Sequence, residues 1–400
     1  MTELPERVLV LGLARSGEAA TAALERRGVE VVRADRKLGN DGDLSLLDRV
    51  GLLVKSPGVP GEAALVHEAR ERGIPVWSEI ELGFRLVENP ILGVTGTNGK
   101  TTTAELLGAL FRADGRAVAV AGNVGRPLAS LVGELPADAW IVCELSSFQL
   151  EDIERFRPRV GVLLNLEPDH LDRHGTFERY RAAKLRVFEN QQPEDAAVVP
   201  RGFAEVPGAG DRIEFAADDE LPAEPKLRGT HNRENAAAAT AAARAAGLPD
   251  EAIAEGLRTF ASVPHRLELV AERRGVRYVN DSKATNVAAA LRALAAYADE
   301  PVHLILGGSR KGEDFAPLAD AIGPNVERVY LIGETAADLR DLVPGHVPAG
   351  DLATAVAEAA AAAKPGDVVL LSPACASYDQ FPDFEHRGEE FRRLVENLPM

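Results

Sequence analysis

The sequence predicts an α/β fold with three domains, each built around a largely parallel sheet. Short apolar runs alternate with segments of helical spacing along the whole chain, which is typical of βαβ units. Several of these runs end in glycine or in polar residues, as the ligand-binding turns of parallel sheets do. At 400 residues, the chain is also longer than one hydrophobic core usually serves.

The first region, residues 1–88, begins as a βαβ unit. Its predicted elements are strand 7–12, helix 16–28, strand 29–32 and strand 51–55. The pattern Gly12-x-Ala14-x-x-Gly17, with Asp35 just past the second strand, is a dinucleotide-type fingerprint whose middle glycine is replaced by alanine. The pattern is weak alone, but it predicts a Rossmann-like domain that ends near residues 88–90.

The second region opens with the most informative motif of the chain. An apolar run at residues 91–94 leads into the glycine-containing loop and helix start Gly96–Thr102. A strand, a glycine loop and a helix N-terminus together form a phosphate cradle, or P-loop, because backbone N–H groups converge on the phosphate oxygens. Lys100 is expected to reach the terminal phosphates and the Thr101 hydroxyl to bind Mg²⁺. The strict spacing would need glycine at position 94, where the chain has Val94.

Alternation of strands and helices continues to the end of the chain. In the second region, the predicted strands are 117–121, 139–144, 160–165 and 196–199, and the predicted helices are 126–133, 176–190, 235–247 and 250–260. A hinge is expected at 262–265. Beyond it, the predicted strands are 276–280, 302–306, 328–332 and 367–371, and the predicted helices are 284–297 and 351–363. The last region is therefore expected to be a Rossmann-like α/β domain.

Composition excludes several classes of protein. The net charge of −17 argues against general nucleic-acid binding and against an anionic membrane surface. No apolar run approaches the roughly 18 residues that a transmembrane helix needs, and the polar, acidic N-terminus is not that of a signal peptide. Cys143 and Cys375 are too few for a disulfide framework or a four-cysteine zinc site. We therefore expect a cytoplasmic protein.

Three side chains in the second region are candidates for metal chemistry. Glu144 follows an apolar strand beside the glycine loop, where a carboxylate can hold Mg²⁺ or simply cap a helix. His170 lies in a polar cluster after the next strand. It is a candidate metal ligand or substrate contact, and the alternative is a structural histidine. Lys184 lies on a basic helix, and a functional role requires that it point inward rather than into solvent.

Further polar groups mark the start of a helix and the loops of the last region. Asn232 and Asn235 share one helix face and offer amide donors and acceptors. Arg266 follows the hinge and is either a phosphate contact or an ordinary surface arginine. The polar loops after strands of the last region are 280–286, 307–311 and 372–381. Together they predict a binding rim for an acidic co-substrate.

A family resemblance rests on the order of the motifs Gly96–Thr102, Gly122–Gly125, Glu144–Gln149, Tyr180–Lys184, His231–Asn235, Pro264–Arg266, Asn280–Asn286 and Ser372–Ser377. Over essentially the whole chain, this series resembles the Mur ligases of peptidoglycan synthesis. The resemblance implies a UDP-substrate-binding domain (1–88), a central ATPase domain (89–261) and a C-terminal amino-acid-binding domain (262–400). It also implies ATP-dependent ligation of D-glutamate to UDP-N-acetylmuramoyl-L-alanine through an acyl phosphate.

The resemblance assigns roles to individual residues. The implied ATP contacts are Gly96, Asn98, Gly99, Lys100, Thr101, Thr102, Asn232, Asn235, Arg266 and Asp281. The implied ligands of two Mg²⁺ ions are Thr101, Glu144, His170 and Lys184, with Lys184 carbamylated; Lys100, Glu144, His170 and Lys184 are the implied catalytic residues. The implied substrate contacts are Arg15, Asp35, Arg36, Ser56 and Asn123 for the UDP substrate, and Lys283, Thr285, Lys311, Ser377 and Phe384 toward glutamate.

Other functions compete with this interpretation. A sibling Mur enzyme or a folylpolyglutamate-type ligase would use a different acceptor or amino acid. A nucleotide-dependent oxidoreductase, suggested by the Gly12 fingerprint, leaves the phosphate loop without a role. A P-loop switch or binding module leaves Glu144 and Lys184 without one. We expect a monomer whose partners are its small-molecule substrates, not nucleic acid or membrane.

Overall fold

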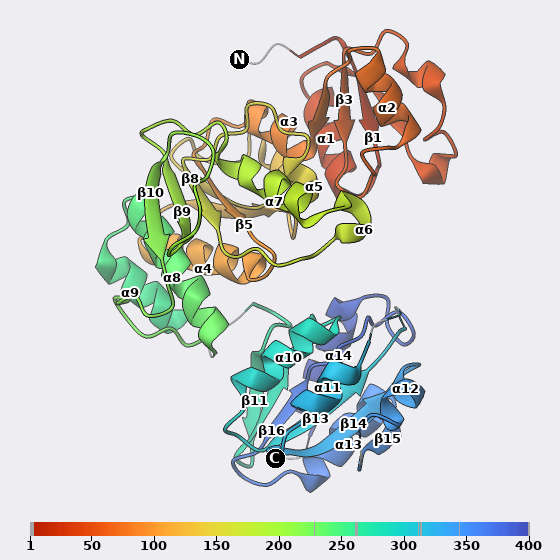
Figure 1. Ribbon diagram of the computed structural model, residues 1–400, viewed down its shortest axis with the longest axis vertical. Helices are drawn as coiled ribbons and strands as arrows, with labels where there is room; N and C mark the ends of the chain where they lie inside the picture. The colour runs from red at the N-terminus through yellow and green to blue at the C-terminus, as the bar shows by residue number, and fades with distance from the viewer. Residues whose placement is uncertain are drawn as a thin grey trace. The chain divides into compact units, whose positions relative to one another are not determined.

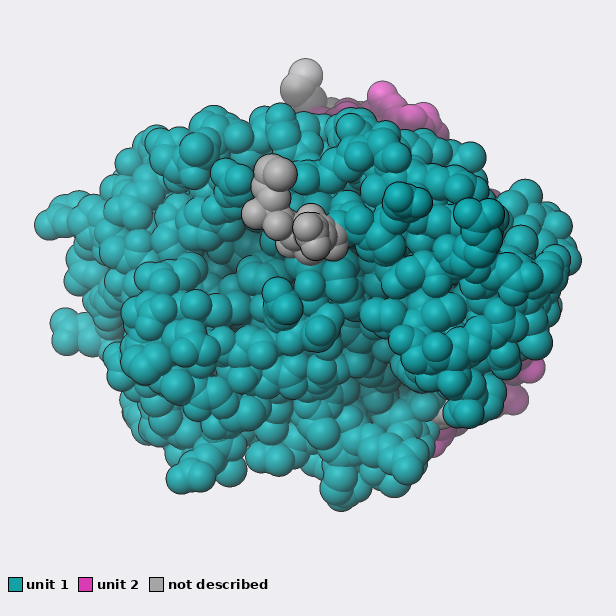
Figure 2. Space-filling view, turned by 90° about the horizontal axis from the view of Figure 1, so that it is seen from above, with its two compact units in different colours: residues 1–225, 231–260 teal, residues 226–230, 261–400 magenta. Residues whose placement is uncertain are grey.

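The computed structural model describes residues 4–227, 229–260, 263–310, 312, 314–343 and 345–398. The chain forms two compact units, coloured separately in Figure 2: residues 1–225 with 231–260, and residues 226–230 with 261–400. In the described part of the chain, the first unit contains two sheets and the second unit contains one. Helices connect the strands of these sheets, and the strands run parallel except for one edge strand in the second unit. The predicted α/β class is therefore confirmed.

The N-terminal sheet of the first unit has the strand order β2-β1-β3-β4 and is entirely parallel. Its elements are β1 (Arg7–Leu11), α1 (Arg15–Glu25), β2 (Glu30–Ala34), β3 (Leu52–Lys55), α2 (Ala64–Glu71), β4 (Val76–Ser78) and α3 (Glu79–Leu86). Helices α1 and α3 pack on one face and α2 on the other (Figure 1). Burial on both faces explains why β1 and β3 read as continuous apolar runs.

The central sheet of the first unit has the order β10-β9-β8-β5-β7-β6 and is also parallel. Its strands are β5 (Ile91–Thr95), β6 (Val118–Gly122), β7 (Trp140–Glu144), β8 (Val160–Leu163), β9 (Ala196–Pro200) and β10 (Asp211–Phe215). Its helices are α4 (Lys100–Ala113), α5 (Ser147–Leu150), α6 (Leu171–His174), α7 (Phe177–Leu185), α8 (Thr230–Ala245) and α9 (Asp250–Thr259). Strand β5 lies in the middle, so the loop after it faces the loops after β7 and β8.

Helix α8 owes its place in the core to alanine. Its residues Ala236–Ala239, Ala242 and Ala243 are buried in one cluster with side chains of α4, α9 and the central strands. Alanine favours helix and adds little bulk, so the helix backbone can approach its neighbours closely. This packing carries the start of α8, with its two asparagines, toward the carboxyl end of the sheet.

The second unit has a six-stranded sheet in the order β11-β12-β16-β13-β14-β15, in which only β11 is antiparallel to its neighbour. Its strands are β11 (Glu268–Arg273), β12 (Val276–Asn280), β13 (Val302–Gly307), β14 (Val326–Ile332), β15 (Val347–Gly350) and β16 (Val368–Leu371). Its helices are α10 (Val287–Ala296), α11 (Ala316–Ala321), α12 (Ala336–Arg340), α13 (Leu352–Ala362) and α14 (Phe384–Glu396). Apolar clusters fill both faces of this sheet.

Two of the predicted helices are replaced, wholly or in part, by 3₁₀ turns. The predicted helix 126–133 is only a 3₁₀ turn, Leu128–Leu131, because Pro127 precedes it in extended conformation and Gly133 follows with φ +76°. The predicted helix 176–190 ends at Leu185 and continues as a 3₁₀ turn over 186–188. Of the predicted hinge 262–265, residue 262 lies outside the described residues.

The two sheets of the first unit meet at a buried carboxyl group. Glu79 begins α3, and its Oε1 accepts a hydrogen bond from the backbone N–H of Ala129 at 2.6 Å. Its other oxygen is buried and has no hydrogen-bond partner among the described residues. Burial raises the pKa of Glu79 to about 7, against which the Ala129 bond acts in the opposite direction.

We expect Glu79→Gln to stabilise the protein at pH 8 but not at pH 5. The unfolded carboxyl group titrates near 4.5, and the raised folded pKa makes folding bind a proton, so the free energy of unfolding falls as pH rises from about 4.5 to 7. Glutamine keeps the acceptor for Ala129 and cannot ionise, so its advantage at pH 8 should be about 1–3 kcal/mol. Thermal unfolding at both pH values measures it. An equal effect at both values contradicts the assignment, and Glu71→Gln on the exposed side of α2 is the control.

Candidate functional site

The phosphate loop lies between β5 and α4, as predicted. Gly96 has φ +153° and Gly99 has φ +85°, conformations that favour glycine. A Cβ added to Gly99 would lie 2.3 Å from the Oδ1 of Asn235, so the loop backbone passes directly against helix α8. Asn232 lies one turn before Asn235 and accepts its amide at 3.4 Å. Both asparagines are buried, which brings two of the predicted nucleotide contacts to the loop.

Two lysines share one acceptor in this loop. The Nζ of Lys100 donates to the carbonyl oxygen of Gly96 at 2.9 Å and to that of Thr97 at 2.8 Å. The Nζ of Lys184 donates to the same Gly96 oxygen at 2.8 Å. Lys184 is therefore directed inward, as a functional role requires, and only 2% of the residue is exposed. Burial, reinforced by repulsion from Lys100, lowers the pKa of Lys184 to about 7.

Glu144 ends β7, the strand beside β5, and is buried. Its Oε1 accepts a hydrogen bond at 3.1 Å from the side-chain amide of Asn123, which follows β6. Among the described residues, no lysine, arginine or histidine lies within 4 Å of this carboxylate. A buried carboxylate that forms no ion pair within 4 Å has the donor chemistry that a divalent cation requires.

His170 lies at the start of α6 with φ +51°, a backbone conformation that is uncommon for a residue with a side chain. Its ring is about half exposed, 4.9 Å from the ring of Phe148, and its Nε2 is 3.5 Å from Asp169. The described residues contain no group of three histidine, cysteine, aspartate or glutamate side chains that could hold a metal ion. The predicted ligand set depends instead on a hydroxyl and a modified lysine.

The phosphate loop is braced by residues that sequence reasoning missed. Asn165 accepts a hydrogen bond from the backbone N–H of Asn98 at 2.8 Å and donates to its carbonyl oxygen at 3.2 Å. The side-chain amide of Asn98 donates to Glu167 at 2.9 Å. The hydroxyls of Thr97 and Tyr180 are 2.9 Å apart. The available signal was position, because Asn165 and Glu167 follow β8, the other neighbour of β5.

In the N-terminal sheet, the predicted residues support the turn between β1 and α1. The carboxylate of Asp35 accepts hydrogen bonds from the backbone N–H groups of Leu13 at 2.6 Å and Lys37 at 2.7 Å. These bonds lower the pKa of Asp35. The Ser56 hydroxyl donates to the Gly12 carbonyl oxygen at 2.6 Å. Arg15 and Arg36 are exposed beside the same strand ends, so the predicted set shares one edge of the sheet.

The second unit gathers its predicted residues at the carboxyl ends of β12 and β16. Asp281 accepts a hydrogen bond from the Ser372 hydroxyl at 2.8 Å, and burial raises its pKa to about 7. The Nζ of Lys283 lies 5.2 Å from the ring centre of Phe384. Ser377 is buried in the loop after β16.

Three further predicted contact residues belong to this part of the sequence: two are partly buried, and the third lies outside the described residues. Thr285 is partly buried, and its backbone N–H bonds the Lys283 carbonyl oxygen. Arg266 is partly buried, and its positive charge acts to lower the pKa of Asp281, against the larger effect of burial. Lys311 lies outside the described residues.

Sequence reasoning also missed Arg387. Its buried guanidinium donates to the Ser282 carbonyl oxygen at 2.9 Å and to the carbonyl oxygens of Cys375 and Ala376 at 3.0 and 3.1 Å. One side chain therefore joins two of the predicted rim loops.

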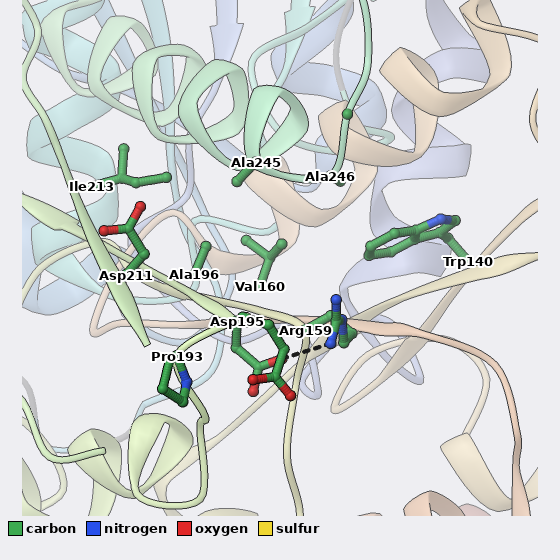
Figure 3. Close-up of a pocket in the computed structure, with 12 residues that line it drawn as sticks. Trp140, Arg159, Val160, Pro193, Asp195, Ala196, Asp211, Ile213, Ala245 and Ala246 are labelled. Carbon is green, nitrogen blue, oxygen red and sulfur yellow. Dashed lines mark ion pairs between the residues drawn. The ribbon is translucent and has the colours of Figure 1, made fainter. Parts of the chain in front are cut away.

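A cavity of about 450 Å³ lies at the opposite end of the central sheet (Figure 3). Trp140, Val160, Ala196 and Asp211 line it, and each is the first residue of its strand. The ion pair of Arg159 with Asp195 lies on its wall. Ligands of parallel sheets bind at the carboxyl ends of the strands. This cavity contains none of the predicted site residues.

Known protein families and relatives are similar to this chain over much of its length. Two family models match: the Mur ligase middle domain over residues 94–206 and the Mur ligase glutamate ligase domain over residues 265–375. A UDP-N-acetylmuramoylalanine--D-glutamate ligase of Anaeromyxobacter dehalogenans is 47% identical, with 97% of each chain covered. The enzyme of the same name from Acidobacterium capsulatum is 42% identical, with 98% of this chain and 96% of that protein covered.

Solved structures show the same fold. MurF ligase from Thermotoga maritima in complex with ADP has a TM-score of 0.64 at 18% identity, over 98% of this chain and 96% of that one. UDP-N-acetylmuramate-alanine ligase MurC from Thermotoga maritima has a TM-score of 0.62 at 17% identity, over 98% and 99%. None of the helices described here is both long and apolar enough to span a membrane. On its full-length relatives and its two matching domain models, the chain belongs to the Mur ligase family.

Proposed function

We propose that this chain is an ATP-dependent ligase that joins D-glutamate to UDP-N-acetylmuramoyl-L-alanine, with ADP and phosphate as the other products. The observation that carries the proposal is the meeting of Lys100 and Lys184 on one carbonyl oxygen of the phosphate loop, with the buried Glu144 on the adjacent strand. The names of relatives at 42–47% identity supply the substrates.

The chemistry requires activation of a carboxylate, because a carboxylate is a poor electrophile. A carboxylate oxygen of the substrate's alanine attacks the γ-phosphorus of ATP, the bond to the β-phosphate oxygen breaks, and ADP leaves. The amine of D-glutamate then attacks the acyl carbon, loses a proton, and phosphate departs from the tetrahedral intermediate. The protein contributes positioning and charge neutralisation, with Lys100 and the loop N–H groups opposite the transferred phosphoryl group.

Magnesium fits the residues at the start of α4 and the end of β7. Thr101 and Glu144 offer oxygen ligands, and the buried Glu144 forms no ion pair within 4 Å among the described residues. We include Thr101, Glu144, His170 and a modified Lys184 in the proposed ligand set. When bound, Mg²⁺ would neutralise phosphate charge and orient the phosphate chain.

We also propose that Lys184 carries a carbamate. Its amine is buried beside Lys100, and no carboxylate lies within 4 Å of it among the described residues. Attack of the uncharged amine on CO₂ forms an N–C bond and releases a proton, which turns a cation into an anion. The change replaces repulsion between the two lysines with attraction and supplies oxygen atoms for a metal.

The co-substrates are assigned by the two remaining groups of residues. We place the UDP moiety at the strand ends that carry Asp35 and Ser56, and D-glutamate at the loops that carry Lys283 and Ser377. A lysine is a natural partner for a substrate carboxylate. The proposal includes a role in peptidoglycan precursor synthesis, and so in cell-wall biogenesis, cell shape and cell division, by a monomer in the cytoplasm.

One assay tests this function. Purified protein is incubated with ATP, Mg²⁺, UDP-N-acetylmuramoyl-L-alanine and one amino acid at a time, and phosphate release and the ligated product are followed. We expect turnover with D-glutamate and none when the UDP substrate is omitted. Turnover only with L-alanine, or only with another amino acid, would move the chain to a sibling activity within the family. No turnover with any amino acid would contradict the proposal.

A further inference from the structure

Arg173 in helix α6 joins the two sheets of the first unit. Its Nη1 donates to the carbonyl oxygen of Pro57 at 2.8 Å, and its Nη2 donates to that of Val59 at 3.0 Å. Both carbonyls belong to the turn after β3, directly behind Ser56. The side chain is 14% exposed, and Nη2 also lies 3.7 Å from the carboxylate of Glu151.

One face of the same guanidinium lies over the Phe148 ring, with the guanidinium carbon 3.8 Å from the ring centre. Phe148 belongs to the short helix α5, four residues after the candidate metal ligand Glu144. A guanidinium over an aromatic face in a partly dehydrated site is attracted to it electrostatically. Arg173 is therefore held from two directions at once.

From Phe148, ring contacts continue to the phosphate loop. The Phe148 ring is 4.9 Å from His170 and is stacked at 5.3 Å on His174. The His174 ring lies 5.3 Å from the Tyr180 ring, edge to face. The Tyr180 hydroxyl is 2.9 Å from that of Thr97 in the phosphate loop. A packed series of side chains thus runs from the turn after β3 to the nucleotide cradle.

The shape of the guanidinium group explains why an arginine suits this position better than a lysine. The guanidinium is planar and presents several N–H donors in a fixed fork, so it can bond two carbonyl oxygens while one face stays on a ring. A lysine ammonium at the same place keeps the charge but has no planar face to stack. The fixed fork sets the distance between the turn and Phe148, which neither contact alone would do.

We propose that Arg173 is a positioning residue that fixes the UDP-substrate turn, Ser56–Val59, against the Phe148–His170 side of the catalytic centre. The inference rests on the proposed function for its substrates. Arg173 touches the turn that carries Ser56, and through Phe148 it orients His170, so its effect falls on binding of the UDP substrate and on alignment of that substrate with the phosphate loop. It does not touch the nucleotide loop itself.

The test compares wild type with Arg173→Lys and Arg173→Ala in steady-state kinetics and in amide hydrogen exchange of residues 56–60. For both variants, we expect the KM for the UDP substrate to rise about tenfold, within the range that a misplacement of roughly 1 Å produces. The KM for ATP should change less than about twofold, because the phosphate loop keeps its own contacts. Exchange at the Val59 amide, which bonds Ser56, should accelerate in both variants without any ligand.

Arg212→Ala is the matched control, because Arg212 also donates to two backbone carbonyls, those of Phe203 and Ala204, near the edge strand β10. Its kinetics should equal those of wild type at a similar loss of thermal stability. A wild-type KM for the UDP substrate in Arg173→Lys, or a parallel rise of both KM values, would overturn the inference.

The experiment distinguishes failure of the proposed ligase function from failure of the positioning role of Arg173. If wild type showed no ligase activity, the hydrogen-exchange comparison would still decide the positioning role, and unchanged exchange in Arg173→Lys would reject it.

Discussion

Lys100→Ala is expected to lower ATP turnover by about 10³-fold, because it removes the side-chain ammonium at the start of α4 that we expect to face the transferred phosphoryl group. Lys100 bonds the carbonyl oxygens of Gly96 and Thr97, so it lies over the loop that cradles the phosphates. Backbone N–H groups and the helix N-terminus would still attract the nucleotide. The rate of phosphoryl transfer should therefore fall by a larger factor than the affinity for the nucleotide.

Binding and turnover are measured separately for this variant. Calorimetric titration of the UDP substrate should give wild-type affinity, since the N-terminal sheet is untouched. Phosphate release should fall to near background. Arg112→Ala, in the last turn of the same helix, is the control and should turn over normally. Turnover of Lys100→Ala within about tenfold of wild type would contradict the assigned role, since removal of one such donor typically costs more.

Lys184→Ala is expected to be nearly inactive, with a loss of at least about 10²-fold. In the proposed state, the carbamate on Lys184 is an anion beside Lys100, and truncation removes both the anion and its metal-binding oxygens. The variant also leaves space where a buried side chain stood. A small carboxylate such as formate or acetate can enter that space and replace the missing oxygens.

Chemical rescue separates a carbamate role from simple packing. Added acetate should restore part of the activity of Lys184→Ala, with saturation, and should leave wild type unaffected. Arg179→Ala, exposed on the same helix, should be active with or without acetate. Full activity of Lys184→Ala without acetate would remove the lysine from the mechanism. Mass spectrometry under gentle, CO₂-saturated conditions should detect the carbamate on wild type.

The sequence was sufficient for those parts of the site that depend on local rules. The phosphate loop combines a buried strand, two glycines and a helix start within a dozen or so neighbouring positions, and the structure has all of these. Glu144 could be placed for a related reason, because strand ends in a parallel sheet share one edge. The absence of glycine at position 94 had no consequence, since Val94 lies inside β5 and is fully buried.

Contacts between distant segments could not be predicted. Asn165 bonds Asn98 across 67 positions, and Arg173 bonds Val59 across 114. Nothing in the local sequence of either residue records its partner, because the pairing depends on the strand order of the sheets. The inward direction of Lys184 is of the same kind, since its helix has basic residues on several sides.

An edge strand and a helix rich in charged residues were among the elements that the sequence did not predict. Strand β11 has an irregular burial pattern and pairs antiparallel with β12 at the edge of its sheet, so its sequence gives no continuous apolar run. Helix α14 was missed although Asp383 caps it, because its charged residues outnumber its buried ones. Ligand assignments for the three regions, and those for Lys311, stay predictions.

The most direct test of the central claim follows an oxygen atom. UDP-N-acetylmuramoyl-L-alanine labelled with ¹⁸O in its alanine carboxylate is turned over with ATP and D-glutamate, and the released phosphate is analysed by mass spectrometry. Transfer of the γ-phosphoryl group to that carboxylate predicts one ¹⁸O atom in each phosphate formed from fully labelled substrate. Unlabelled phosphate, with ligated product present, would contradict an acyl phosphate formed beside Lys100 and Lys184.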